Sequence, residues 1–261
     1  MTRNTRIDGH FDRLSSSYDR YRTLDHEPVR YLASKLPHSE HTICDLGCGT
    51  GRYLFALIEQ LEANKDTVNG AYGVDVSQTM LETARERAEG LGMSISWIEA
   101  SADRTGLAPD SISLVTAFNV IFHLPIRETL EEVARIARPK ALFAVYARLR
   151  EQEAEHVWGR WFPGYIDYTI NPTREFMLGF SEQNRLFRLV DSRDFTFSRK
   201  TTLTEICEQT EGKFYSTLAR YPDSEFERAY ETFVANLKFN FDDPNEVVYP
   251  STYSMFLYQV E

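Results

Sequence analysis

The chain is short of cysteine, and this shortage excludes two classes of protein. Its 261 residues contain three cysteines, Cys44, Cys48 and Cys207. This small, odd number does not fit a disulfide scaffold. Cys44 and Cys48 lie close together, but no further Cys or His follows at a spacing that completes a tetrahedral zinc site. We therefore expect no metal site, and interpret the pair as one small buried side chain and one loop residue.

Clustered basic residues and long apolar runs are also missing. The chain carries 29 Lys and Arg against 39 Asp and Glu, a formal net charge of -10. Without a basic stripe to neutralise phosphates, nucleic acid and anionic membrane surfaces are poor partners. No stretch is long and apolar enough to span a bilayer, and the polar segment 1–9 does not resemble a signal peptide. We therefore expect a cytoplasmic protein. The sequence does not fix its oligomeric state.

What the first part of the chain does contain is a regular alternation of strand and helix patterns. Short apolar runs bounded by glycine indicate buried strands, and apolar residues at helical spacing indicate the helices between them. This alternation predicts an α/β fold with a mostly parallel sheet and helices on both faces. Strands are predicted at 42–46, 70–76, 95–99, 112–118 and 142–147, and helices at 27–36, 52–61, 78–89 and 127–137.

The regular alternation of strand and helix patterns ends near residue 150, and aromatic residues become frequent after it. Strands are predicted at 187–199 and 247–260, and helices at 204–215 and 224–239. The aromatic segment 158–168 has two interpretations. It could cover a substrate pocket, together with the cationic side chains, or it could form a second small core, because aromatic residues are core-formers first. The side chains concerned are Trp158, Arg160, Trp161, Phe162, Tyr165, Tyr168 and Arg174.

A glycine-rich loop follows the first predicted strand of the α/β region. Gly47, Gly49 and Gly51 permit positive φ angles and a close approach of the backbone to a ligand. The helix that follows offers free N–H groups to an anionic part of that ligand. The dinucleotide pattern G-x-G-x-x-G is not met, because the third glycine comes one position early. Asp45 would repel a pyrophosphate but could accept hydrogen bonds from an ammonium group, which favours a cofactor that carries an amino acid over NAD.

At this point the sequence resembles a known family. Residues 43–51, Ile-Cys-Asp-Leu-Gly-Cys-Gly-Thr-Gly, are similar to motif I of the class I S-adenosylmethionine-dependent methyltransferases. The resemblance continues in order through residues 73–81, 101–103 and 110–115, and covers about residues 10–150. It implies a doubly wound, Rossmann-like sheet of seven strands, mostly parallel with an antiparallel last strand, and a helical and aromatic lid inserted in the C-terminal half.

The resemblance also implies a division of the chain and a set of binding residues. The expected division is an N-terminal lid segment (1–26), a cofactor-binding core (27–150), lid insertions (151–186 and 200–245) and final antiparallel strands (187–199 and 247–260). In the core, the loop and Asp45 surround the methionine end of the cofactor, Asp75 takes the ribose hydroxyls, and the remaining residues contact the adenine or the sulfonium. The expected cofactor-binding residues are Tyr18, Arg22, Asp45, Gly47, Cys48, Gly49, Gly51, Asp75, Val76, Met80, Ser101, Ala102, Asp103 and Asn119.

Methyl transfer demands little catalytic machinery, because the sulfonium makes the methyl carbon electrophilic without help. The protein aligns the reactants and excludes water, and needs a base only if the acceptor must lose a proton. Tyr18 and His123 are the candidate catalytic residues: Tyr18 stands in an N-terminal segment resembling one that lies over the cofactor in relatives, and His123 follows the fourth strand. A packed histidine is an equally good interpretation of His123, and a solvated helix with ion pairs is an alternative for residues 18–22.

The sequence therefore predicts an S-adenosylmethionine-dependent methyltransferase that produces S-adenosylhomocysteine and modifies an unidentified small-molecule acceptor. Two alternatives remain. An NAD(P)-dependent oxidoreductase is disfavoured by the glycine spacing and by Asp45. A non-catalytic S-adenosylmethionine-binding protein would share every cofactor residue. The acceptor atom, O, N, C or S, is not fixed by the sequence.

Overall fold

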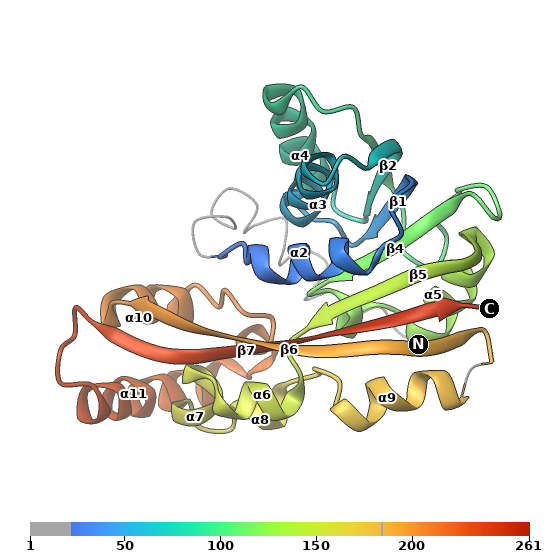
Figure 1. The fold of residues 1–261 in the computed structure, drawn as a ribbon. Helices are drawn as coiled ribbons and strands as arrows, with labels where there is room; N and C mark the ends of the chain where they lie inside the picture. The colour runs from blue at the N-terminus through green and yellow to red at the C-terminus, as the bar shows by residue number, and fades with distance from the viewer. Residues whose placement is uncertain (1–21, 184) are drawn as a thin grey trace. The chain divides into compact units, whose positions relative to one another are not determined.

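The structure is a computed structural model that describes residues 22–183 and 185–261 (Figure 1). Helices separate the successive strands of the chain, except that β3 is followed directly by β4 without a helix between them. The strands are β1 (Glu40–Leu46), β2 (Thr67–Asp75), β3 (Ser96–Glu99), β4 (Ile112–Phe118), β5 (Ala137–Ala147), β6 (Phe187–Thr201) and β7 (Val247–Val260). The α-helices are α2 (His26–Lys35), α3 (Arg52–Ala63), α4 (Gln78–Leu91), α5 (Ile126–Ile136), α6 (Arg150–Glu155), α7 (Val157–Trp161), α8 (Tyr165–Tyr168), α9 (Arg174–Gln183), α10 (Leu203–Glu211) and α11 (Asp223–Asn240), with short 3-10 turns η1 (Ile121–His123) and η2 (Leu218–Arg220).

The strands form one seven-stranded sheet in the order β3-β2-β1-β4-β5-β7-β6. β1 pairs in parallel with both β2 and β4, and β5 pairs antiparallel with β7. The strand order reverses between β1 and β4, which is where doubly wound sheets bind their ligands. The predicted fold class is confirmed: a Rossmann-like sheet whose last strand is antiparallel.

The central strands form because their residues suit burial on both faces of a sheet. β4 is apolar apart from a serine and a threonine, and is buried along nearly its whole length. α3 is buried all round over residues 53–58, and it begins after Gly51, whose left-handed conformation turns the chain from the loop into the helix. α4 begins at Ser77, whose side chain accepts a hydrogen bond from the Met80 backbone N–H at 3.3 Å.

The chain divides into two compact units, which we describe separately. The sheet unit contains the described residues up to Ala147, Glu175–Arg193 and Ser254–Glu261. The aromatic unit contains Arg148–Arg174 and Asp194–Tyr253. β6 and β7 each contribute residues to both units, so the chain passes between them in extended conformation.

The aromatic unit has a hydrophobic core of its own. Trp158 is fully buried there, and its indole N–H donates to the Thr210 hydroxyl at 2.8 Å. Phe162 and Phe233 pack with ring centroids 5.2 Å apart. In Figure 1, α10 and α11 lie beside the outer halves of β6 and β7. Trp158, Phe162 and Tyr165 therefore serve as core residues, which favours the second-core interpretation for this part of segment 158–168.

Some predicted boundaries were wrong by several residues. The helix predicted at 127–137 ends at Ile136, and β5 begins at Ala137, earlier than expected, because Ala137 already pairs with Ile112 of β4. The helix predicted at 204–215 ends at Glu211, where the Gly212 N–H bonds back to Glu208 and the helix stops.

Candidate cofactor site

The glycine loop between β1 and α3 has the backbone conformation that only glycine adopts readily. Gly47, Gly49 and Gly51 have φ angles of 62°, 53° and 77°. A Cβ built on Gly47 would lie 2.3 Å from the Val120 side chain, so that side of the loop is tightly packed. A Cβ on Gly49 would have no atom of the described residues within 4 Å. The loop therefore presents open space at Gly49, where a ligand could approach the backbone.

Asp75, the last residue of β2, is joined to this loop. Its Oδ2 accepts a hydrogen bond from the Gly49 N–H at 2.8 Å, and its Oδ1 accepts one from the Ser77 N–H at 2.9 Å. A carboxylate can accept several hydrogen bonds at once. The half-buried Asp75 carboxylate thus joins the glycine loop to the start of α4.

Asp45, the acid before the loop, is buried at the carboxyl end of β1. Its Oδ1 accepts a hydrogen bond from the Thr116 hydroxyl at 2.6 Å. Burial raises the pKa of Asp45 to about 7; the nearby Asp75 charge adds to this, and the Thr116 bond acts in the opposite direction. The sequence analysis missed Thr116, although it is a polar residue in an otherwise apolar stretch of β4 and pairs directly with Asp45 in the sheet register.

Trp97 of β3 is a second residue that the sequence analysis missed. A Cβ on Gly73 would lie 2.4 Å from the Trp97 ring, and a Cβ on Gly51 would lie 2.8 Å from it. Phe55 of α3 packs against the same ring with centroids 5.8 Å apart. Trp97 therefore fixes the position of the loop end and of β2 by filling the space that two glycines leave. No spacing rule identifies such a contact.

The segment after β3 contains the predicted adenine-contacting residues. Ser101 and Asp103 are half-buried and hydrogen-bond each other through their side chains, whereas Ala102 is buried. The Ala100 N–H donates to the Asp75 carbonyl oxygen at 3.0 Å. The structure thus brings this segment beside the end of β2, as the prediction requires.

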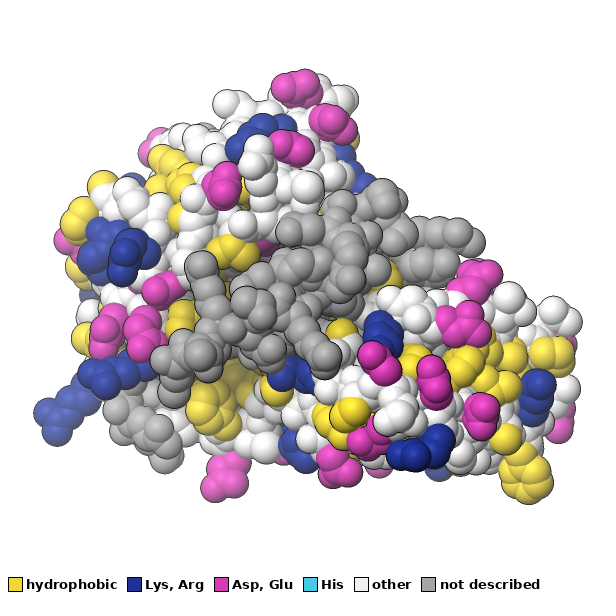
Figure 2. Space-filling view, turned by 180° about the vertical axis from the view of Figure 1, so that it is seen from behind, with side chains coloured by type: hydrophobic (Ala, Val, Ile, Leu, Met, Phe, Trp, Pro, Cys, Tyr) yellow, Lys and Arg dark blue, Asp and Glu magenta, His cyan; other side chains and the backbone are white. Residues whose placement is uncertain are grey.

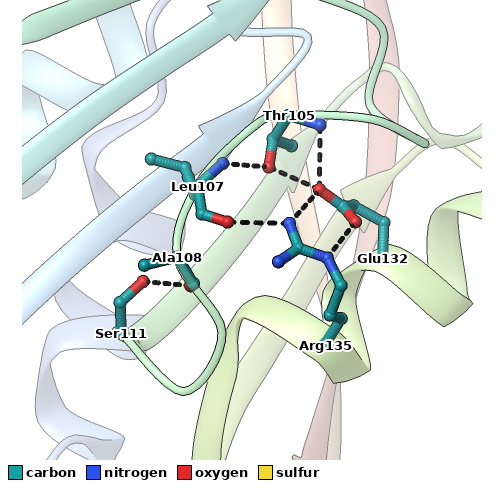
Figure 3. A network of polar contacts seen from close by, with 6 residues as sticks. All are labelled: Thr105, Leu107, Ala108, Ser111, Glu132 and Arg135. Carbon is teal, nitrogen blue, oxygen red and sulfur yellow. Dashed lines mark hydrogen bonds and ion pairs between the residues drawn. The ribbon is translucent and has the colours of Figure 1, made fainter.

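A polar network holds the continuation of that segment to α5 (Figure 3). Glu132 is buried and accepts hydrogen bonds from the Thr105 N–H at 2.8 Å and from the Thr105 hydroxyl at 2.6 Å. Arg135 donates to Glu132 and also to the Leu107 carbonyl oxygen, each within 2.8 Å. Burial by itself raises the pKa of Glu132, but the bonds from Arg135 and Thr105 outweigh it and lower the pKa.

The two apolar residues predicted near the adenine have different environments. Val76 directly follows Asp75 and is 60% exposed, which is unusual for a valine at the end of a buried strand. Met80 is buried in α4. Cys48 is buried within the loop, and its N–H donates to the Val74 carbonyl oxygen at 3.0 Å.

The segment after β4 carries Asn119 and His123. Asn119 adopts a φ of 57° and donates its N–H to the Tyr146 carbonyl oxygen at 2.7 Å. His123 lies in η1 and is half-buried, with its ring 4.6 Å from that of Phe122. Arg22 is half-buried. Tyr18 and most of the predicted N-terminal lid segment lie outside the described residues.

Other features bear on metal and membrane binding. Within residues 22–183 and 185–261, no three His, Cys, Asp or Glu side chains gather closely enough to hold a metal ion. Cys44 and Cys48 are buried, and burial raises the pKa of both thiols.

In the same ranges, no helix has the length and apolar character needed to cross a bilayer. Figure 2 shows Lys and Arg interspersed with Asp and Glu over the described part of one face.

Comparisons with known proteins identify the domain around this loop. Residues 43–140 match the family model of a methyltransferase domain. Methyltransferase GfsG from Streptomyces halstedii is 35% identical over 108 residues, which are 40% of this chain and 37% of GfsG. A malonyl-acyl-carrier-protein O-methyltransferase from Marinomonas sp. (strain MWYL1) is 29% identical over 154 residues, which are 58% of this chain and 54% of the relative. The matches thus span only about a third to a half of these two relatives.

Solved structures share the fold over most of the chain. The YcgJ protein of Bacillus subtilis is 14% identical with a TM-score of 0.59, covering 91% of this chain and 99% of that one. A geranyl diphosphate methyltransferase solved in complex with SAM is 15% identical with a TM-score of 0.55, covering 97% of this chain and 91% of that one. At such identities the likeness shows the fold alone. The domain match covers residues 43–140, which contain the glycine loop, and it identifies this part of the chain as a methyltransferase domain, of the kind that uses S-adenosylmethionine.

Proposed function

We propose that the protein transfers a methyl group from S-adenosylmethionine to a small-molecule acceptor by in-line displacement. The observation that carries the proposal is the arrangement at Gly49: open space over the loop backbone, beside the Asp75 carboxylate. Support for a small acceptor comes from the geranyl diphosphate methyltransferase, whose name gives such a substrate. The net charge of -10 further disfavours a nucleic-acid acceptor.

The residues present fit the cofactor. We assign its methionine end to the glycine loop and Asp45, because a buried carboxylate can pair with an ammonium group. Asp75 would accept the two ribose hydroxyls, because it is an acid at the carboxyl end of the strand beside the loop. Exposed Val76 would pack on the adenosine, which would remove its apolar surface from water. The full assignment is Asp45, Gly47, Cys48, Gly49 and Gly51 at the methionine end, Asp75, Val76 and Met80 at the ribose and adenine, Ser101, Ala102 and Asp103 at the adenine edge, and Asn119 with Tyr18 and Arg22 near the sulfonium and carboxylate.

The chain's own residues would orient the two reactants and accept a proton from the acceptor where one must be lost. When bound, the cofactor supplies an electrophilic methyl carbon. Asp75 and the loop hold its nucleoside in one orientation, which lowers the entropic cost of aligning the reactants. His123 is our candidate base for an acceptor that must lose a proton, and Tyr18 remains a second candidate. The predicted lid and domain boundaries and the cytoplasmic location stay predictions.

The two alternative functions gain no support from the comparisons. An oxidoreductase would need a loop that tolerates a pyrophosphate, whereas Asp45 is buried beside this loop and Asp75 bonds directly to it. A non-catalytic cofactor-binding protein would share the same site, so the experiment must measure turnover and binding separately.

The test is an acceptor screen that measures S-adenosylhomocysteine formed from S-adenosylmethionine. Candidate acceptors are supplied as pools of hydroxylated, amino and thiol compounds, each with His123→Ala as a matched variant. We expect at least one pool to give product above the acceptor-free rate. Tight cofactor binding without product from any pool would instead support the non-catalytic alternative.

A further inference from the structure

Thr116 is a fully buried residue of β4 in the sheet unit. The other polar residue of this strand, Ser113, exchanges hydrogen bonds with the backbone of Thr42 on β1. A buried hydroxyl needs a hydrogen-bond partner. The Thr116 hydroxyl takes the Asp45 side chain, and donates to its Oδ1 at 2.6 Å. One hydroxyl of β4 therefore contacts the backbone of β1, and the other contacts the acid that precedes the glycine loop.

The sheet register leaves Asp45 with a single donor on the neighbouring strands. Asp45 is in register with Gly73 of β2 and with Thr116 of β4, so all three lie on the same face of the sheet. Gly73 has no side chain, and the ring of Trp97, its own partner on β3, fills that space: a Cβ on Gly73 would lie 2.4 Å from the ring. Of the two residues in register with Asp45, only Thr116 has a side chain that can donate a hydrogen bond.

The ionised form of Asp45 needs such a donor, because the carboxyl is buried. Burial raises the pKa of Asp45 to about 7, the Thr116 bond counteracts this rise, and the charge of Asp75 adds to it. Asp45 also interacts with the thiols of Cys44 and Cys48, whose own pKa values are raised by burial, so both thiols stay neutral. Among the described residues, Thr116 is therefore the group that favours a charged Asp45.

We propose that Thr116 is a positioning residue for the cofactor: its hydroxyl keeps the Asp45 carboxylate charged and oriented for the ammonium group of S-adenosylmethionine. This inference rests on the proposed function, in which Asp45 lies at the methionine end of the cofactor. A carboxylate that accepts a bond at Oδ1 can still accept one at Oδ2. A side chain that is fixed before the ligand arrives also loses less conformational entropy on binding. Thr116 acts through Asp45 and needs no contact with the ligand.

The test compares three variants of the full-length protein with the wild type. Thr116→Val keeps the shape of the side chain and removes the donor, and Thr116→Ser keeps the hydroxyl without the methyl group. Ser113→Ala is the matched control, because it removes the other hydroxyl of β4, which bonds to the Thr42 backbone. Each protein is unfolded in urea without ligand from pH 5 to pH 8.5, and is titrated calorimetrically with S-adenosylhomocysteine over the same range.

The two measurements should change together in Thr116→Val. In the wild type, the contribution of Asp45 to stability should stop changing near pH 7. In Thr116→Val, that change should continue to a pH about one unit higher or more, as expected when a hydrogen bond to a charged group is lost. Affinity for S-adenosylhomocysteine should then be about fivefold lower or more at pH 7, since the charged fraction of Asp45 falls from about a half to about a tenth. Thr116→Ser and Ser113→Ala should keep the wild-type pH profiles.

The proposal is overturned if Thr116→Val keeps the wild-type pH profiles. It is also overturned if Thr116→Ser behaves like Thr116→Val, because the methyl group and not the hydroxyl would then matter. If Thr116→Val does not fold, Thr116→Cys replaces it; its weak S–H donor should shift both profiles in the same direction. Absence of S-adenosylhomocysteine binding to the wild type overturns the proposed function and this inference together, whereas the ligand-free unfolding profiles report on the Thr116 bond alone.

Discussion

The backbone N–H of Gly49 donates a 2.8 Å hydrogen bond to the carboxylate of Asp75. This bond joins the loop after β1 to the end of the neighbouring parallel strand β2. It makes Asp75 responsible for the shape of the ligand-free loop as well as for the proposed contact with the ribose. Changes at either residue should therefore affect binding more than folding.

The first prediction concerns two glycines with similar φ angles. Gly49→Ala adds a methyl group that meets no protein atom, so its cost to folding is the left-handed strain, about 1–2 kcal/mol. Gly47→Ala bears similar strain and also clashes with Val120. We expect Gly47→Ala to unfold at clearly lower urea concentration. Gly49→Ala should keep most of its stability but lose affinity for S-adenosylhomocysteine. Equal stability of the two variants would contradict the packing described for Gly47.

The second prediction concerns pH and Asp45. The pKa of Asp45 is raised to about 7 in the folded protein, above the value of about 3.9 expected when unfolded. The folded state therefore binds more protons between these values, and the contribution of Asp45 to stability falls as pH rises from about 4 to about 7. Above pH 7 this contribution is constant. Urea unfolding of wild type and Asp45→Asn across this range should show the slope in wild type and its reduction in the variant.

Cofactor affinity should change with pH in the opposite direction. If the Asp45 carboxylate pairs with the ammonium group of the cofactor, binding below pH 7 must displace a proton. Affinity for S-adenosylhomocysteine should then rise from pH 5 to pH 7, by up to about tenfold per pH unit, and level off above. Calorimetry in buffers of different ionisation enthalpy would detect the released proton. A flat profile in wild type would remove Asp45 from the proposed binding set.

The third prediction concerns the network in Figure 3. Glu132→Ala leaves Thr105 without its acceptor and Arg135 without its partner, and should cost about 3 kcal/mol of unfolding free energy. Glu131→Ala is the matched control, because Glu131 is exposed and pairs with exposed Arg127. Its cost should stay below about 1 kcal/mol. Similar losses for both variants in urea unfolding would show that the network contributes little.

The strands of the sheet could be predicted from the sequence, because the pattern that specifies a strand lies within a short stretch of the chain. The strands predicted at 112–118 and 247–260 coincide with β4 and β7. The first is an apolar run between turn residues, and the second is rich in β-branched and aromatic residues. Asp75 and the glycine loop were also found from local pattern. Their juxtaposition follows from topology, because the carboxyl ends of neighbouring parallel strands share one edge of the sheet.

The contacts that sequence reasoning missed are non-local. Trp97 packs over Gly51 and Gly73, and no spacing rule relates these three positions. An arginine in a turn is ordinarily solvated, so sequence reasoning did not single out Arg220, whose buried Nε has no hydrogen-bond partner in the described part of the chain. Tertiary packing decides such features, so they become visible only when distant segments are brought together.

The most direct test of the cofactor site is calorimetric titration of S-adenosylhomocysteine into wild type and Asp75→Asn. The variant keeps the size of the side chain but loses the charge and half of the acceptor capacity that hold Gly49 and, in the proposed complex, the ribose. We predict measurable binding to wild type and at least about tenfold weaker binding to a folded Asp75→Asn, the loss expected for a charge-assisted hydrogen bond. No binding to wild type, or equal binding to both, would contradict the site proposed here.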